Sequence, residues 1–388
     1  MRLIFFCGRM PDLCGAFLHD IDLAIELQRR GHEIVFLTII DIPKEGVNGG
    51  FYRGFKYMHY SAGGKYLDVS EGWICPHFPS LPEVRRLNNR GYNRPIMTTC
   101  HYDGSYTALI KNNLGRVIRW QEMVMFINGV METNFKKNVD PWPPNITRTA
   151  VVRPLMHEEK IRINEKFQGD CITLVNANEN KGVNQFIEIA KRMPNRKFLA
   201  IKPYYGNLNP MIVPNNVELI PFDDDIRNVL KRTRILLMPS YYESFGRIAV
   251  ESMYNGIPVI YSRPVSNSKH PGGSTEGVEE WIKPAGISCE REDIEEWASL
   301  ITSLDDETIY SERSELVKQH IQTMNLFTEV TRVAGLVENF VRENPVKIQT
   351  PQSKQEELMQ QTPQQTATKI VEPTGRVGFS TGRLRIQR

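Results

Sequence analysis

The sequence predicts an α/β protein built from two doubly wound parallel sheets. Its 388 residues exceed what one hydrophobic core usually serves, and they suit two domains. Short apolar runs alternate with segments of helical periodicity in two successive stretches, one beginning at the N-terminus and one near Asp170. No apolar run approaches the ~18–20 residues that a membrane span needs, and no signal-peptide pattern opens the chain, so we expect a cytoplasmic protein.

The first stretch opens with the strand "RLIFF", a glycine-containing turn at "GRMPDLCGAF" and a helix from about His19 to Arg30. Apolar residues from Ile21 to Leu27 fall at helical spacing, and Gly31 suits the position that closes a helix. The strand "IVFLTII" follows, which gives a strand–helix–strand unit with a right-handed crossover. The runs "PIMTTCH" and "MVMFING" continue the same sheet.

The second stretch begins with the strand "CITLVNA" and the helix "VNQFIEIAKRM", and continues through "KFLAIK", "VELIPF", "IRNVLKR", "ILLMPS" and "PVIYS". From Glu292 to Asn344 the pattern is helical only. We therefore expect domains at 1–165 and 166–325, a closing helix at 326–345 and a tail at 346–388. The tail is rich in Gln, Thr and Pro and carries 7 basic against 3 acidic residues, which predicts disorder.

The cysteine and charge patterns limit the kinds of site and of binding partner that the protein can have. The six cysteines are spaced without a C-x-x-C pair, which predicts reduced thiols and neither a disulfide framework nor a zinc site. Residues 1–150 carry 18 basic against 14 acidic residues, whereas residues 151–345 carry 23 against 28. A local basic cluster suits either an anionic partner or an ordinary solvated surface. Its members are Arg85, Arg86, Arg90 and Arg94.

The stretch "ESFGRIAVESMYNGIPVI" follows a predicted strand and combines a helix start with two carboxylates. Ser244 is a candidate N-cap, and Gly246 would let a ligand approach the backbone closely. A helix N-terminus attracts phosphate groups, and Glu251 lies roughly 12 Å along the helix from Glu243. A carboxylate at each end can accept hydrogen bonds from hydroxyls, so the spacing suits a nucleoside diphosphate sugar.

These residues, together with several other segments, resemble the retaining GT-B glycosyltransferases of the group 1, or family-4, type. That family carries E-x7-E in an "ESFG…E…GxPVI" pattern, a "GG-x-x-E" loop that "GGSTE" matches, and a "KG" segment that "NKGVNQFIEIAKRM" matches. In the first domain "GRMPDLCGAF", "RRGHEIVFLT" and "TTCHYD" also fit. The resemblance covers roughly residues 1–345. It implies two Rossmann-like domains that face each other across a cleft, with a C-terminal helix crossing back to the first.

The resemblance also implies a role in donor binding for each matching residue. Glu251 would hold the ribose hydroxyls, Glu243 the transferred sugar and Lys181 the departing diphosphate. Gly15 would lie close to the donor, and His101 would bond to the sugar from the first domain. The other positions implied are Pro221 and Phe222 at the base, Ser244, Phe245 and Gly246 at the helix start, and Gly272, Gly273 and Glu276 in the glycine loop.

One position departs from the family pattern. Where the family often has an arginine five residues before the lysine, this sequence has Asn176. The leaving diphosphate needs a cationic partner, and enzymes of this family usually need no metal, so we expect Arg247 to supply the charge, with Lys202 as the weaker candidate. The catalytic residues expected are therefore Glu243, His101, Lys181 and Arg247, with no metal ligands.

The implied reaction is transfer of a hexose-type sugar from a UDP- or GDP-sugar to an acceptor hydroxyl, with retention of configuration and no further cofactor. A sugar-nucleotide epimerase or a phosphorylase-like enzyme on the same fold is an alternative, although no lysine motif for pyridoxal phosphate can be recognised. A non-catalytic module that binds nucleotide sugars or nucleic acid is another. No G-x-G-x-x-G follows the first strand, which argues against a pyridine-nucleotide dehydrogenase.

No motif specifies the acceptor. The segment from His77 to Arg94 is expected to border it, together with Tyr102, Asp103, Arg116 and Arg119. This charge suits a phosphorylated lipid, an acidic glycan or modified DNA, and it leaves peripheral contact with a membrane open. Nucleic acid as the acceptor predicts binding that weakens steeply with salt.

Overall fold

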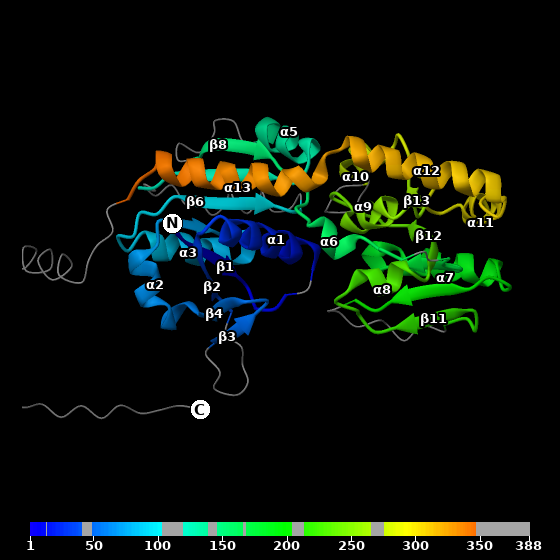
Figure 1. Cartoon of the computed structure of the whole chain (residues 1–388), viewed down its shortest axis with the longest axis horizontal. Coiled ribbons are helices and arrows are strands. Elements are labelled where there is room, and N and C mark those ends of the chain that lie inside the picture. The colour runs from blue at the N-terminus through cyan, green and yellow to red at the C-terminus, as the bar shows by residue number, and fades with distance from the viewer. Residues whose placement is uncertain are drawn as a thin grey trace, which may run out of the picture. The chain divides into compact units, whose positions relative to one another are not determined.

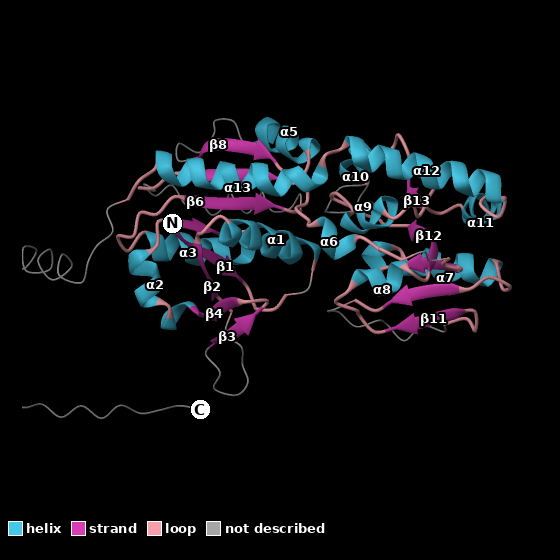
Figure 2. Cartoon of the chain, viewed as in Figure 1, coloured by secondary structure: helices cyan, strands magenta, loops and turns pink. Residues whose placement is uncertain are grey.

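The computed structural model contains the two parallel sheets that the sequence predicts (Figures 1 and 2). It describes residues 1–12, 14–40, 49–102, 119–138, 146–165, 168–203, 213–264 and 275–346. The predicted tail lies outside these residues apart from its first position. Within the described ranges, no helix combines the length and the apolar character needed to cross a bilayer.

The first sheet has eight strands, and neighbouring strands run parallel except for the antiparallel pair β3 and β4. In spatial order they are β3 (Gly49–Tyr52), β4 (Phe55–His59), β2 (Glu33–Thr38), β1 (Arg2–Cys7), β5 (Gly72–Ile74), β6 (Ile96–Cys100), β7 (Glu122–Phe126) and β8 (Ile146–Val151). The central strands are apolar along almost their whole length because both faces of the sheet are covered.

The helical segments of this part are α1 (Gly15–Arg29), η1 (Tyr60–Ala62), α2 (Gly64–Val69), η2 (Phe78–Ser80), α3 (Leu81–Asn88) and α5 (Gly129–Asn138). Helix α1 begins at Gly15 rather than His19, because the sulfur of Cys14 accepts the Phe17 N–H at 3.5 Å and caps the first turn. The helix ends as predicted, with Gly31 in the left-handed region at φ 85°.

Helix α13 (Leu326–Glu343) returns to the first sheet and lies beside α1 (Figure 1). Its buried Val333 and Val337 belong to the same apolar cluster as Ala24 of α1. At the rim, His32 Nε2 lies 2.7 Å from a carboxylate oxygen of Glu338. The prediction of a C-terminal helix that crosses back to the first domain is therefore confirmed.

The second sheet has six parallel strands. In spatial order they are β11 (Val217–Ile220), β10 (Phe198–Ile201), β9 (Cys171–Leu174), β12 (Thr233–Met238), β13 (Val259–Ser262) and β14 (Ile287–Cys289). The helical segments are α6 (Glu158–Ile161), η3 (Glu179–Lys181), α7 (Val183–Arg192), α8 (Ile226–Leu230), α9 (Arg247–Tyr254), α10 (Glu276–Ile282), α11 (Ile294–Ser303) and α12 (Glu307–Thr323).

The strand order of the second sheet reverses between β9 and β12, which are neighbours although five helical segments and strands separate them in the chain. In a doubly wound sheet a crevice opens at the carboxyl ends of the strands at such a switch point. The short strands β5 and β14 were not predicted from the sequence, because three residues are too few to show periodicity.

Candidate functional site

A cavity of about 740 Å³ opens where β9 and β12 end. Val175 and Asn176 follow β9 and line one side, while Ser240 follows β12 and lines another. The first domain contributes the start of α1 and the turn between β3 and β4. Seven of the predicted donor residues line this cavity: Gly15, Asn176, Lys181, Phe222, Glu243, Arg247 and Glu251.

Lys181 and Glu243 form an ion pair inside the cavity. Lys181 ends η3, where the side chain of Asn178 accepts its backbone N–H at 3.1 Å. Gly182 follows at φ 76°, and an added Cβ would lie 2.0 Å from the Pro239 carbonyl oxygen, so only glycine fits there. The lysine Nζ donates to Glu243 Oε2 at 2.5 Å, and Glu243 is only 7% exposed.

The loop that leads into α9 is held by aromatic stacking and by hydrogen bonds to its carbonyl groups, without a side-chain cap on the helix. Helix α9 is preceded by Gly246 at φ 76° without a side-chain cap, so the predicted N-cap at Ser244 is wrong. The carbonyl of Ser244 instead accepts from the Asn128 amide at 2.6 Å. Phe245 is buried and stacks on Trp281, whose indole N–H donates to the Phe245 carbonyl at 2.8 Å. Neither Ser244 nor Phe245 lines the cavity.

Arg247 connects the two domains at the floor of the cavity. Its Nε donates to Glu251 Oε1 at 2.8 Å, one helical turn further along α9. Its two terminal nitrogens reach the carbonyl of Leu155 at 2.8 Å and the carboxylate of Asp22, on α1, at 3.0 Å. Burial alone would lower the pKa of Arg247, but the carboxylates of Asp22 and Glu251 outweigh it and raise this pKa. Arg247 therefore stays charged although it is almost fully enclosed.

Asp22 was not predicted as a site residue, and it forms ion pairs with two cations that line the cavity. Its side chain is 2% exposed, and besides Arg247 it pairs with Lys160, from the segment between the two sheets. The ring of His157 lies 3.9 Å from the same carboxylate. The only sequence signal was "HDID", which places polar residues on the buried side of an otherwise apolar helix.

Burial raises the pKa of Glu251, and the nearby Arg247 only partly opposes that effect.

Lys160, Lys181 and Arg247 are each bound to a carboxylate of the chain. The lining contains five basic and six acidic residues. These are Arg53, Lys160, Lys181, Arg227 and Arg247 against Glu159, Asp223, Asp224, Asp225, Glu243 and Glu251.

Of the two residues predicted to contact the base of the donor, only one lines the cavity. Phe222 lines the cavity, whereas Pro221 is exposed and does not. Asn176, at φ 65°, accepts from the Asn178 amide at 2.9 Å, so no cation replaces the missing arginine at this position. Glu276 is the first residue of α10 and is not part of the lining. Gly272 and Gly273 lie outside the described residues.

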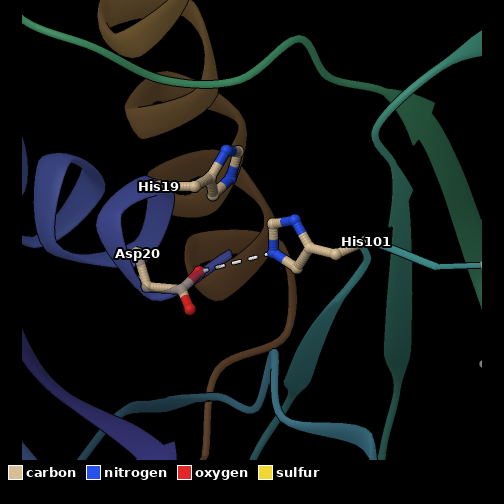
Figure 3. A group of neighbouring side chains, drawn as sticks. All are labelled: His19, Asp20 and His101. Atoms are coloured by element: carbon tan, nitrogen blue, oxygen red, sulfur yellow. Dashed lines mark ion pairs between the residues drawn. The ribbon is translucent and has the colours of Figure 1, made fainter. Parts of the chain in front are cut away.

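His101 follows β6 and meets two residues of α1, His19 and Asp20 (Figure 3). His101 Nε2 lies 3.8 Å from Asp20 Oδ1, and the two imidazole rings meet edge to face at 4.9 Å. One possible metal-ligating atom of each side chain lies within 4.8 Å of the others. These three residues are the candidates for holding a metal ion among the residues that the structure describes.

The basic cluster of the first domain does not form one surface. Arg85 is buried, with its Nε donating to Glu122 at 2.8 Å, and Arg94 is buried, with one nitrogen donating to the Asp68 carbonyl at 3.0 Å. The expected basic surface thus retains, of the four arginines, only Arg86, which pairs with Glu83, and Arg90. Arg85 is buried on α3, whereas Arg94 lies between α3 and β6.

Near the cavity, Tyr102 is 43% exposed and meets Tyr242 edge to face at 5.4 Å. This pair links the end of β6 to the loop that carries Glu243. Among the other residues expected on the acceptor side, Arg119 is exposed and His77 is half-buried. Asp103 and Arg116 fall outside the described part of the chain.

Residues 158–322 match the model of the family described as glycosyl transferases group 1. The second domain belongs to the group 1 glycosyltransferases. The chain is also similar to a D-inositol 3-phosphate glycosyltransferase from Corynebacterium kroppenstedtii, with 27% identity over 123 residues. That match spans 31% of this chain and about a quarter of the relative's length.

Solved glycosyltransferases share the fold over most of the chain. A sucrose-phosphate synthase from Thermosynechococcus elongatus superimposes with a TM-score of 0.60 and 14% identity over 88% of this chain and 100% of that one. An α-glucosyltransferase bound to UDP and a 13-mer DNA with an HMU base gives 0.58 and 13% over 86% and 99%. The chain therefore has the GT-B fold, with a group 1 glycosyltransferase domain as its second half.

Proposed function

We propose that the protein transfers a hexose-type sugar from a nucleoside diphosphate sugar to an acceptor hydroxyl, with retention of configuration and without a metal ion. The observation that carries the proposal is the pairing inside the cavity. Glu243 and Glu251, the two carboxylates of the E-x7-E pattern, each hold a cation, Lys181 and Arg247 respectively. Both pairs lie at the switch point where an α/β sheet binds its ligand.

A nucleotide sugar supplies new partners for all four groups at once. Its hydroxyls donate to Glu243 and Glu251, while its phosphate oxygens accept from Lys181 and Arg247. Donor binding is thus an exchange of ion pairs for hydrogen bonds and phosphate contacts. The exchange explains how a cavity lined by more acidic than basic residues accommodates a diphosphate dianion.

The chemistry then rests on positioning and charge. Lys181 and Arg247 stabilise the negative charge that develops on the leaving diphosphate, which is the kind of term that dominates such transfers. A glycosyl cation-like state follows, and the acceptor attacks from the face that the diphosphate leaves. A diphosphate oxygen takes the acceptor's proton, so configuration is retained without an enzymic nucleophile.

One structural neighbour is in complex with UDP and with a 13-mer DNA that contains an HMU base, so UDP-sugars and modified DNA are the first candidates to screen. A mass-spectrometric screen of UDP- and GDP-sugars with the full chain, in the presence of a chelator, tests the proposal. We expect release of one nucleoside diphosphate together with an α-configured product from an α-donor. Binding without release would indicate a non-catalytic module, and conversion of the sugar on the intact nucleotide would indicate an epimerase.

A further inference from the structure

Three buried side-chain atoms near the cavity have no hydrogen-bond partner among the described residues. They are His19 Nε2, Asp20 Oδ1 and His101 Nε2, and they belong to three neighbouring side chains (Figure 3). Buried polar atoms in folded proteins nearly always have a partner, so a group of three calls for an explanation. Their closest charged contact is the ion pair between Asp20 and His101, whose 3.8 Å separation is longer than a hydrogen bond.

A bound metal ion is the first explanation to test, because two imidazoles and a carboxylate are a common ligand set. The backbone of Leu155 decides against it. Its N–H donates to His19 Nδ1 at 3.1 Å, so this nitrogen carries no proton. In the neutral ring the proton must then sit on Nε2, which leaves that atom no lone pair for a metal. Metal-ligating histidines have the opposite arrangement, with the non-ligating nitrogen as donor.

His19 is held in the neutral form. Burial lowers its pKa well below the usual value, and the nearby His101 and Arg247 act in the same direction. It therefore presents a fixed N–H to the shared space and neither a charge nor a lone pair. This leaves Asp20 and His101 as the pair whose protonation can change.

Burial raises the pKa of Asp20 to about 6, an effect that His101 opposes and Asp12 reinforces. The other titratable groups that face it are the thiols of Cys7 and Cys75, whose pKa values burial raises far above the usual range, so they stay neutral. Asp20 is accordingly ionised at neutral pH and becomes protonated as the pH falls through about 6.

We propose that Asp20 is the positioning residue of His101, resting on the function proposed above. The carboxylate of Asp20 keeps the proton of His101 on Nε2, which leaves Nδ1 free to accept a hydroxyl hydrogen of the transferred sugar. The present separation of 3.8 Å is longer than a hydrogen bond, and closing it takes a shift of roughly 1 Å. Such bonds commonly tighten only when the substrate is bound.

The matched test is Asp20→Asn, which preserves volume and removes the charge. An asparagine amide can donate to His101 Nε2, and the imidazole proton would then move to Nδ1, where it repels a hydroxyl donor. We expect kcat for nucleoside diphosphate release to fall tenfold or more with KM changed less than about threefold. Asp170→Asn, at an exposed carboxylate paired with Lys197, is the control and should behave as wild type.

The pH profile and a double variant separate positioning from a merely structural role. Wild-type kcat should fall as the pH drops through about 6, because Asp20 becomes protonated, and Asp20→Asn should lose this acid limb. In a His101→Ala background, Asp20→Asn should have no further effect on kcat. Additive losses, or an unchanged acid limb, would overturn the proposal.

Two measurements need no turnover. Nitrogen NMR of the full chain should show His101 protonated at Nε2 in the wild type and at Nδ1 in Asp20→Asn, and the same tautomer in both would contradict the proposal. Metal analysis of the purified wild type should find no stoichiometric ion, whereas one lost on Asp20→Asn would overturn it in favour of a metal site. If no donor is turned over but the tautomer changes, the proposed function fails and Asp20 still positions His101.

Discussion

The two sheet edges that border the site handle buried polar groups in opposite ways. At the edge of the second sheet, Lys181 and Arg247 are bound to carboxylates at 2.5 and 2.8 Å. At the edge of the first sheet, Asp20 and His101 lie 3.8 Å apart and leave buried atoms unpaired. Both arrangements cost stability compared with an apolar core, since buried charges and unpaired polar atoms are both unfavourable.

The difference indicates which interactions each sheet edge is suited to make. Paired groups can exchange partners, so the second edge is suited to a ligand that brings both hydroxyls and phosphates. The groups of the first edge make no hydrogen bond that a ligand could replace, and they are suited to fixing the protonation of one imidazole. The comparison predicts that variants of Glu243 and Arg247 change donor binding and turnover, while variants of Asp20 and His101 change turnover and its pH dependence.

Arg247→Ala should produce the largest effect, because it leaves the buried carboxylate of Glu251 without its cation and takes one of the two from Asp22. We expect the free energy of unfolding to fall by about 3–5 kcal/mol, measured by denaturant unfolding. Adding Asp22→Asn should recover part of that loss by removing one of the two carboxylates. No recovery would mean that the ion pair across the domains is not what stabilises this floor.

Glu243→Gln should lower turnover by about 10²–10³-fold, because the amide neither pairs with Lys181 nor accepts as strongly from a sugar hydroxyl. Nucleoside diphosphate release is the measurement. Glu188→Gln, at an exposed carboxylate paired with Lys191, is the matched control and should retain full activity. Equal losses in the two variants would remove Glu243 from the site.

Gly15→Ala tests whether a ligand approaches the first edge. An added Cβ at Gly15 meets nothing within 4 Å, and its backbone is not left-handed, so the ligand-free fold should tolerate it. We expect an unchanged melting temperature and weaker donor binding in calorimetry, by roughly tenfold, or about 1.4 kcal/mol. Unchanged binding would show that the donor stays away from the start of α1.

Arg86→Ala should have the smallest effect. Arg86 is exposed and pairs with the half-buried Glu83 one helical turn earlier on α3, and surface pairs of this kind contribute at most about 1 kcal/mol. Donor turnover should not change. A large loss of turnover would mean that the surface of α3 belongs to the donor site, which would contradict the comparison of the two edges.

The second-domain residues that line the cavity could be predicted to lie together because each belongs to a pattern that is local in sequence. Glu243 and Glu251 lie on the same strand–helix connection, and Lys181 precedes a glycine that the turn requires. Asp22 could not be predicted, since it meets Arg247 only when α1 packs against the second domain. The state of His19 depends in the same way on the backbone of Leu155, 136 residues away.

The prediction of one basic surface on the first domain was wrong for a related reason. Arginines that are close in sequence predict a basic patch only if their side chains all face outward. Arg85 and Glu122 instead neutralise each other inside the first domain, and no local pattern records that pairing. The fold was better predicted, because alternating apolar runs report on sheets directly.

The exchange of ion pairs is tested most directly by a structure of the full chain with a bound nucleoside diphosphate sugar. The account predicts that Lys181 Nζ leaves Glu243, from which it now lies 2.5 Å, and contacts a phosphate oxygen, while Glu243 accepts from a sugar hydroxyl. A donor bound in the cavity with the Lys181–Glu243 pair intact would contradict the account, as would a donor bound elsewhere.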